Sequence, residues 1–365
     1  METSEQKTLD SYRQDQDGNN NLEAADGGNQ NTGSFRKQAT GGIRRHLTQD
    51  ANRETEPKYM PLRRKQPMNL RVRVITALVF GLVMAAFLVP ALWIPWIALI
   101  LFSVIALIGG SEFSAAMKLA GFNHKPWVVP LCSLIAVFLP LIKIGFGKKE
   151  YLVWTSGWTG IALLLPYLVV GLMVTLIVII PLVRYGVEAL TGALVAALGV
   201  IYLSYPLISA VAILYTLPAG WYWLLTALAV PWISDTVAYF IGSSIGTNKI
   251  VPHISPNKTL EGALGGLIGP IIAMMIWLPL VLAQKSKLIV LPPTGTLLTY
   301  AVLFGLLLGL FSQLGDLFAS ALKRWAGVKD FGHILPGHGG LLDRFDSAFF
   351  TLPLTLLLGL LYFGV

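Results

Sequence analysis

The sequence predicts an all-α polytopic membrane protein with about nine transmembrane helices and a disordered hydrophilic N-terminal tail. Of its 365 residues, 55% are hydrophobic and only 13% are charged, whereas an ordinary soluble domain carries about 25% charged residues. The apolar residues come in uninterrupted runs of about 18 or more, the length that a helix needs to cross a hydrocarbon layer about 30 Å thick. We therefore expect lipid to surround most of the chain.

Three regions differ in composition. Residues 1–70 are rich in Gln, Asn, Gly, Thr, Asp and Arg and poor in apolar residues, and such a segment cannot offset the entropy cost of folding. We expect a disordered cytoplasmic tail there, without a signal-peptide core and too acidic for an organelle transit peptide. Residues 71–217 are predicted to form N-terminal membrane helices, and residues 218–365 a second membrane region that carries the polar loops described below.

The apolar runs give the expected spans. The fifth run is long enough to form two short helices broken near Pro206, so the count of nine is open by one. Small-residue pairs such as Gly305 and Gly309 have the spacing that lets membrane helices approach closely. The spans lie near residues 72–93, 95–110, 127–142, 159–181, 188–217, 221–241, 261–283, 296–319 and 347–364.

The charge around the first span predicts the orientation. Positive residues favour the cytoplasmic side of a membrane, and counting nine crossings from a cytoplasmic N-terminus places the loops at 242–260 and 320–346 together on that side. The two polar segments richest in reactive side chains are thus expected on one face of a plasma (inner) membrane. The flanking cations are Arg63, Arg64, Lys65, Arg71 and Arg73.

The formal net charge of +8 does not indicate nucleic-acid binding. Lys and Arg concentrate before the first span and in loops that also carry Asp, Gly and His, and the sequence shows no basic stripe interleaved with exposed aromatic residues. The charge suits membrane orientation and phosphate binding better. Because Cys132 is the single cysteine, neither an intramolecular disulfide nor a cysteine metal cluster can form.

Acidic residues inside the spans are the first sign of a reactive site. A charge at the centre of a membrane helix costs about 2.5–3.5 kcal/mol on insertion scales, so it normally lines a cavity and has a partner. Asp235 lies in the sixth span. In the eighth span Ser312, Asp316, Ser320 and Arg324 follow one another at intervals of four residues, which places them on one stripe of a helix. The sequence thus predicts a polar ridge that runs from the membrane into the following loop.

The loop after the eighth span combines cations, carboxylates and a glycine turn. Lys323, Arg324 and Lys329 precede Pro336-Gly337-His338-Gly339-Gly340, and glycines let backbone N–H groups approach an anion such as phosphate. Asp343 and Asp346 follow three residues apart, on one face if the last helix begins early. Two carboxylates with phosphate oxygens suit Mg²⁺ better than Zn²⁺. Singly each feature has a plain structural explanation, but together they favour metal-assisted phosphoryl or nucleotidyl transfer.

The loop at 242–260 is a weaker signal. It contains glycine, serine and lysine but does not have the spacing of a Walker A loop, and an ordinary helix-capping segment explains it equally well. Ser255 or Thr259 is expected to cap the next helix, with Glu261 nearby. His253, His333 and His338 have spacings that match no familiar zinc cluster.

These segments together resemble the signature of the phosphatidate cytidylyltransferase family, also called CDP-diacylglycerol synthases. The resemblance covers residues 232–347 and identifies 218–365 as a catalytic membrane region, while Asn257 stands where many members carry a basic residue. The matching residues are Ser320-Ala321-Leu322-Lys323-Arg324, Lys329-Asp330, Pro336-Gly337-His338-Gly339-Gly340 and Asp343-Arg344-Phe345-Asp346-Ser347, and upstream Asp235, Ala238-Tyr239, Ser255-Pro256, Lys258-Thr259 and Glu261-Gly262.

The resemblance implies that CTP and phosphatidic acid form CDP-diacylglycerol and pyrophosphate, a step of phospholipid biosynthesis. It implies that Asp316 and Asp343 are ligands of a two-metal centre that contains Mg²⁺. The second ion can be a different cation, and Asp346 and Asp235 are further candidate ligands. Lys323 and Arg324 are expected to act in catalysis, and a homodimer is left open. The residues expected to bind substrate are Lys258, Ser255, Lys329, His338, Gly339, Gly340 and Arg344.

Three other activities stay open at this point. A related membrane enzyme uses CTP to phosphorylate a polyprenol or phytol, and its product lacks the CMP unit. A sugar-phosphate transferase also uses membrane Asp residues and Mg²⁺ but needs a UDP-sugar. A secondary transporter explains the spans and Asp235 but leaves the loop from Pro336 to Asp346 unexplained.

Overall fold

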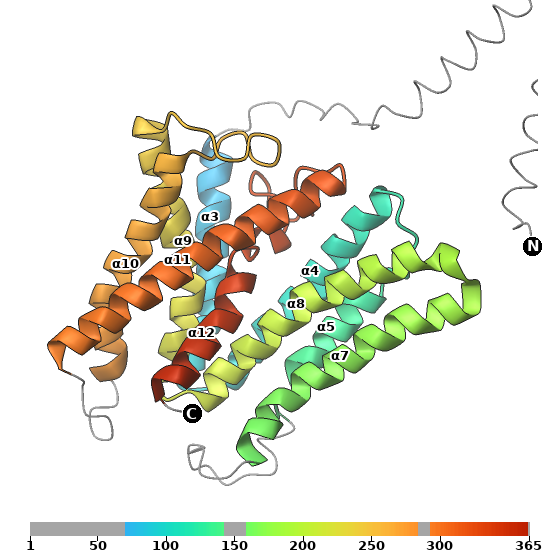
Figure 1. The fold of residues 1–365 in the computed structure, drawn as a ribbon, viewed down its shortest axis with the longest axis horizontal. Coiled ribbons are helices and arrows are strands. Elements are labelled where there is room, and N and C mark those ends of the chain that lie inside the picture. The colour runs from blue at the N-terminus through green and yellow to red at the C-terminus, as the bar shows by residue number, and fades with distance from the viewer. Residues whose placement is uncertain (1–69, 142–157, 284–292, 364–365) are drawn as a thin grey trace, which may run out of the picture. The chain divides into compact units, whose positions relative to one another are not determined.

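The structure is a computed structural model, and it describes residues 70–141, 158–283 and 293–363. The predicted tail lies outside the described residues, apart from the first residue of α3. Within the described ranges the chain forms nine α-helices and three short 3-10 helices, and the two isolated β-bridges belong to no strand (Figure 1). The elements are α3 (Leu70–Leu88), η1 (Pro90–Leu92), α4 (Trp96–Leu119), α5 (Val128–Phe138), α7 (Trp158–Tyr185), η2 (Val187–Ala189), α8 (Leu190–Thr216), α9 (Gly220–Ile245), α10 (Leu260–Ala283), α11 (Thr294–Trp325), η3 (Leu342–Arg344) and α12 (Ala348–Phe363).

The predicted fold class is confirmed. Seven of the helices are long and apolar enough to cross a membrane, and α5 and α12 are shorter apolar helices. Helix α8 is almost wholly buried, whereas α3 and α7 expose most of their apolar side chains. In a protein surrounded by lipid such exposure is favourable, because the solvent is itself apolar. The chain is therefore an integral multi-pass membrane protein.

The proline in α8 does not break the helix. The alternative of two short helices near Pro206 is wrong, because α8 continues from Leu190 to Thr216 with Pro206 in its interior. Proline removes one backbone hydrogen bond and costs about 3 kcal/mol in a helix interior. Pro206 is buried, and α8 packs against α4, α5, α7, α9 and α12. Packing on several sides outweighs the local cost, and lipid offers a broken helix no water to solvate its ends.

Helix α12 lies between two groups of helices. It contacts α8, α9 and α11, while α9, α10 and α11 pack together and α4, α5, α7 and α8 form the other group (Figure 1). The predicted glycine contacts are confirmed in the first group. A Cβ atom at Gly305 would come within 2.5 Å of the Ile271 backbone, and one at Gly309 within 3.1 Å of the Gly266 carbonyl oxygen. The backbones of α10 and α11 thus touch.

Helix α4 is longer than expected. The predicted span ended at residue 110, but the helix continues to Leu119 and includes Glu112. The polar residues Ser111 and Glu112 do not end the helix, and Ser111 bonds the helix backbone itself, donating from Oγ to the Leu107 carbonyl oxygen over 2.7 Å. The added turns carry Glu112 toward the loop between α11 and α12.

Candidate active site

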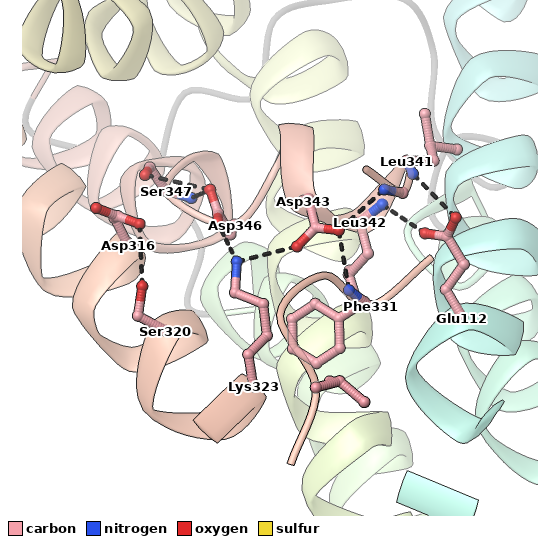
Figure 2. A network of polar contacts seen from close by, with 12 residues as sticks. Glu112, Asp316, Ser320, Lys323, Phe331, Leu341, Leu342, Asp343, Asp346 and Ser347 are labelled. Carbon is pink, nitrogen blue, oxygen red and sulfur yellow. Dashed lines mark hydrogen bonds and ion pairs between the residues drawn. The ribbon is translucent and has the colours of Figure 1, made fainter. Parts of the chain in front are cut away.

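Lys323, near the end of α11, lies between two carboxylates. Its Nζ is 2.9 Å from Asp343 Oδ1 and 3.5 Å from Asp346 Oδ2 (Figure 2). The side chains of Lys323 and Asp343 are only 11% and 3% exposed. Ions removed from solvent in this way need close partners, so the three groups form a buried charged unit.

Asp343 also ties together the loop that it belongs to. Its Oδ2 accepts hydrogen bonds from the backbone N–H groups of Phe331 and Gly340, each over 2.9 Å. With the Lys323 contact, both carboxylate oxygens are engaged. Hydrogen bonds to a charged acceptor are stronger than neutral ones, so Asp343 fixes the loop and is fixed by it.

Asp316 connects the two polar loops. Its Oδ2 is 2.6 Å from Lys258 Nζ in the loop between α9 and α10, and its Oδ1 accepts from Ser320 Oγ one turn later on α11 over 3.4 Å. Arg324, a further turn along, donates from Nε to the Ile254 carbonyl oxygen over 3.3 Å. The helical ridge is confirmed, and the two loops meet at its end.

Asp346 and Asp235 complete the acidic cluster. Asp346 Oδ1 accepts from the Ser347 backbone N–H over 2.8 Å. Burial raises the pKa of Asp346 to about 6, opposed by Lys323 and supported by Asp316 and Asp343. Asp235 on α9 lies within electrostatic range of Asp316 and Asp346, together with the cations of Lys258 and Arg344. The four predicted carboxylates are therefore neighbours.

The orientation of Asp343 and Asp346 has another origin than the one predicted. An early start of the last helix is wrong, because α12 begins at Ala348. The two residues instead flank the end of η3, and both reach Lys323. Backbone hydrogen bonds from Arg344 to Leu341 and from Phe345 to Leu342 close the 3-10 turn, and the Asp343 carboxylate also accepts from the Gly340 N–H, three residues earlier.

The glycine turn before η3 is closed by its own backbone. Gly337 and Gly339 have φ values of 81° and 87°, which residues with a Cβ rarely adopt. The Leu335 N–H donates to the Gly339 carbonyl oxygen over 2.9 Å. Since the Gly340 N–H donates to Asp343, this turn positions the aspartate in addition to any role toward an anion.

Buried polar atoms near the cluster have no hydrogen-bond partner within the described part of the chain: Arg344 Nε, Ser312 Oγ and the hydroxyl oxygen of Tyr202, which lies within electrostatic range of Asp316, Asp343 and Asp346. A buried polar group without a hydrogen bond costs about 1–3 kcal/mol. Such groups are uncommon in folded proteins and call for an explanation such as a ligand or water. They mark where a polar ligand would be stabilised.

Some predicted substrate-binding residues lie apart from the carboxylates. No hydrogen bond or ion pair between described residues joins Ser255, Lys329 or His338 to the acidic cluster. Thr259 Oγ1, not Ser255, caps α10 by accepting from the Gly262 N–H over 3.1 Å. Lys329 lines a cavity of about 1050 Å³ between α4 and the loop after α11.

Glu112 is the residue that the sequence analysis missed. Its Oε1 accepts from the Leu341 N–H over 3.0 Å and its Oε2 from the Leu342 N–H over 2.8 Å (Figure 2). The signal was the same that singled out Asp235, an acid inside an apolar helix. It was lost because the predicted span stopped at residue 110.

Known proteins show which family the chain belongs to. The model of the cytidylyltransferase family matches residues 71–362, which is most of the chain. The chain belongs to the cytidylyltransferase family. The resemblance stated from the motifs is thereby confirmed.

Individual members of the cytidylyltransferase family align over a shorter stretch. A Bacillus subtilis (strain 168) protein named phosphatidate cytidylyltransferase is 47% identical over 134 residues, 37% of this chain and 46% of that protein. Proteins of the same name from Staphylococcus aureus (strain COL) and Staphylococcus saprophyticus are 47% identical over 135 residues and 46% identical over 138, each covering 37% of this chain and 48% of the relative. The chain thus spans about half the length of the curated relatives it matches.

Proposed function

We propose that this protein transfers the cytidylyl group of CTP to phosphatidic acid, giving CDP-diacylglycerol and pyrophosphate in phospholipid biosynthesis. The observation that carries the proposal is the cluster of Asp235, Asp316, Asp343 and Asp346 with Lys258 and Lys323 where the two loops meet. The family match and the relatives' names support the same activity.

The reaction needs no strong base. A phosphate oxygen of phosphatidic acid attacks the α-phosphorus of CTP, the bond from that phosphorus to the oxygen bridging to the β-phosphate breaks, and pyrophosphate leaves. The attacking phosphomonoester is already ionised at neutral pH, so positioning and charge neutralisation supply the catalysis. We assign this role to the cations of Lys258, Lys323, Arg324 and Arg344. Arg344 Nε, which has no hydrogen-bond partner among the described residues, would donate to a phosphate oxygen.

The chemistry of the donor atoms suits Mg²⁺, although among the described residues no three His, Cys, Asp or Glu side chains lie together as a ready-made metal site. The carboxylates at the site offer oxygen ligands, which hard divalent cations prefer. Among the described residues, Oδ1 of Asp316 has only the long 3.4 Å contact with Ser320. Asp316 and Asp343 would hold the ions, with Asp346 and Asp235 nearby. A bound divalent cation would neutralise charge on the triphosphate and the departing pyrophosphate. Lys258 and Lys323 compensate the same carboxylates in the structure described here.

The site is suited to substrates from two phases. CTP is dissolved in water and phosphatidic acid resides in lipid, and Lys258 and Asp343 lie in loops at the ends of helices long enough to cross the membrane. We propose that both loops face the cytoplasm. This follows from a cytoplasmic N-terminus, which the positive charges before the first span favour, and from counting the short α5 as a crossing along with the longer helices. A cysteine at position 328, in a variant with Cys132 replaced, should resist an impermeant thiol reagent added to intact cells. Labelling from outside would overturn the orientation.

The activity is tested with the purified protein in detergent or vesicles. Incubation with CTP, phosphatidic acid and Mg²⁺ should yield a lipid with the mass of CDP-diacylglycerol, together with pyrophosphate. Parallel reactions with a UDP-sugar and a polyprenyl phosphate should yield no product. Sugar-phosphate transfer without any CDP-lipid would refute the proposal.

A further inference from the structure

We propose that Glu112 of α4 is a positioning residue, whose carboxylate holds the backbone before η3 so that Asp343 faces Lys323. The inference rests on the proposed function for its activity measurements, but its geometry is independent of the substrate. It assigns the N-terminal group of membrane helices a direct part in the site.

Both carboxylate oxygens of Glu112 accept hydrogen bonds from backbone groups of the loop. Glu112 is 7% exposed, and its two oxygens accept from two consecutive N–H groups, those of Leu341 and Leu342. Among the described residues no Lys or Arg forms an ion pair with it, and the side chains of Asp343 and His333 lie within electrostatic range. A carboxylate is retained in such surroundings only when hydrogen bonds satisfy it. The contact bridges 229 and 230 residues of sequence.

Two glycines of the loop border the same carboxylate. A Cβ atom at Gly340 would lie 2.6–2.7 Å from three atoms of the Glu112 carboxylate, and one at Gly332 would overlap it. Neither glycine has a positive φ, so backbone conformation does not require glycine at these positions. Glycine is required there because the Glu112 carboxylate occupies the space that a Cβ atom would fill.

The consequence is a short chain of contacts to the reactive groups. Glu112 fixes the N–H groups of Leu341 and Leu342, the next residue is Asp343, and Asp343 contacts Lys323 over 2.9 Å. Release of these N–H groups would loosen η3 and leave the Asp343 carboxylate held only by its own contacts with Phe331, Gly340 and Lys323. Glu112 itself reaches no catalytic side chain through a hydrogen bond or ion pair within the described ranges, so it acts through the loop.

The first test is Glu112→Gln, which keeps the size of the side chain. It replaces one carboxylate oxygen, a hydrogen-bond acceptor, with an NH₂ group, and this donor would then face a backbone N–H that is also a donor. A displacement of about 1 Å at a reacting group costs on the order of a hundredfold, so we expect kcat for CDP-lipid formation to fall about ten- to hundredfold. The KM for CTP should change much less, since the triphosphate-binding cations stay in place. The matched control is Ser114→Ala, on the same helix, buried and without a hydrogen-bond partner among the described residues; it should keep normal kinetics.

The second test uses the glycine contact. Gly332→Ala alone should lower kcat as Glu112→Gln does, because the new methyl group displaces the carboxylate. In a Glu112→Ala background the same Gly332→Ala change should add little, since the obstructing atoms are gone. Gly171→Ala on α7, where a Cβ atom would meet nothing within 4 Å, controls for a general effect of alanine.

The third measurement separates this inference from the proposed function. Hydrogen exchange of the peptide spanning Leu341 and Leu342 should be faster in Glu112→Gln than in the unaltered protein, whatever reaction the protein catalyses. If the unaltered protein makes no CDP-lipid, the proposed function fails while exchange still decides the role of Glu112. Unchanged exchange, normal kcat in Glu112→Gln, or an equal Gly332→Ala effect in both backgrounds would each overturn the inference.

Discussion

The two polar loops are each organised by a glutamate, but in different ways. Glu261 holds the loop between α9 and α10 from the first turn of the next helix, accepting from the Thr247 N–H over 3.1 Å and from Asn248 Nδ2 over 2.9 Å, where the groups are exposed. Glu112 holds the loop between α11 and α12 from a helix more than 200 residues earlier, in a buried position.

The difference shows where precision is needed. Water replaces a surface hydrogen bond at little cost, whereas a buried N–H group that loses its acceptor is left unsatisfied. The first loop contributes Lys258 to the site, and a flexible ammonium tolerates some displacement. The second contributes Asp343, whose two oxygens each have fixed partners. The rigid clamp is therefore found on the loop that carries the carboxylate.

The largest effect is expected from removing the charge of Asp316 or Asp343. Asn keeps the shape of each side chain but not its anchor for a divalent cation. If that cation stabilises the transition state by several kcal/mol, turnover falls on the order of a thousandfold or more. Steady-state rates and the Mg²⁺ dependence of the folded variants are the measurements. Near-normal rates with unchanged Mg²⁺ dependence would assign the metal to Asp235 or Asp346 instead.

A smaller loss is expected from Lys323→Ala. The substitution removes the cation shared by Asp343 and Asp346, but neighbouring cations can share the triphosphate. We expect about a ten- to hundredfold decrease in kcat/KM, corresponding to roughly 1.5–3 kcal/mol for one charged hydrogen bond. A loss as large as that of Asp343→Asn would show that Lys323 cannot be replaced by its neighbours.

Much of this site could be predicted from sequence, because its signals are local. The stripe from Ser312 to Arg324 and the cap at Thr259 depend on spacings of three or four residues within one helix. Glu112 depends on a contact across 229 residues, which one sequence does not reveal. The continuous span at residues 188–217 was predicted, and the open alternative of a break near Pro206 is excluded because tertiary packing overrides a local helix breaker.

The glutamate that holds each loop can be replaced by glutamine, so that the two loops are compared by the same kind of substitution. Glu261→Gln should lower kcat by only about two- to fivefold, since exposed hydrogen bonds contribute little net stability. Glu112→Gln is expected to cost several times more. Equal losses in the two variants, measured under identical conditions, would mean that burial of the clamp is not what matters.

The smallest effect is expected from the N-terminal tail. Residues 1–60 match none of the motifs, and the family match begins at residue 71. Deleting them while keeping Arg63 to Arg73 should leave specific activity within a factor of about two. A collapse of activity in folded, correctly oriented protein would assign the tail a part in the site.

The central claim, cytidylyl transfer to a lipid phosphate, is tested most directly by the position of a label in CTP. The purified protein is incubated with phosphatidic acid and Mg²⁺, and with CTP radiolabelled at either the α- or the γ-phosphate. The account predicts that α-label enters the lipid fraction and γ-label appears only in pyrophosphate. γ-Label in the lipid, with α-label left in soluble CDP, would identify a CTP-dependent kinase and contradict the account.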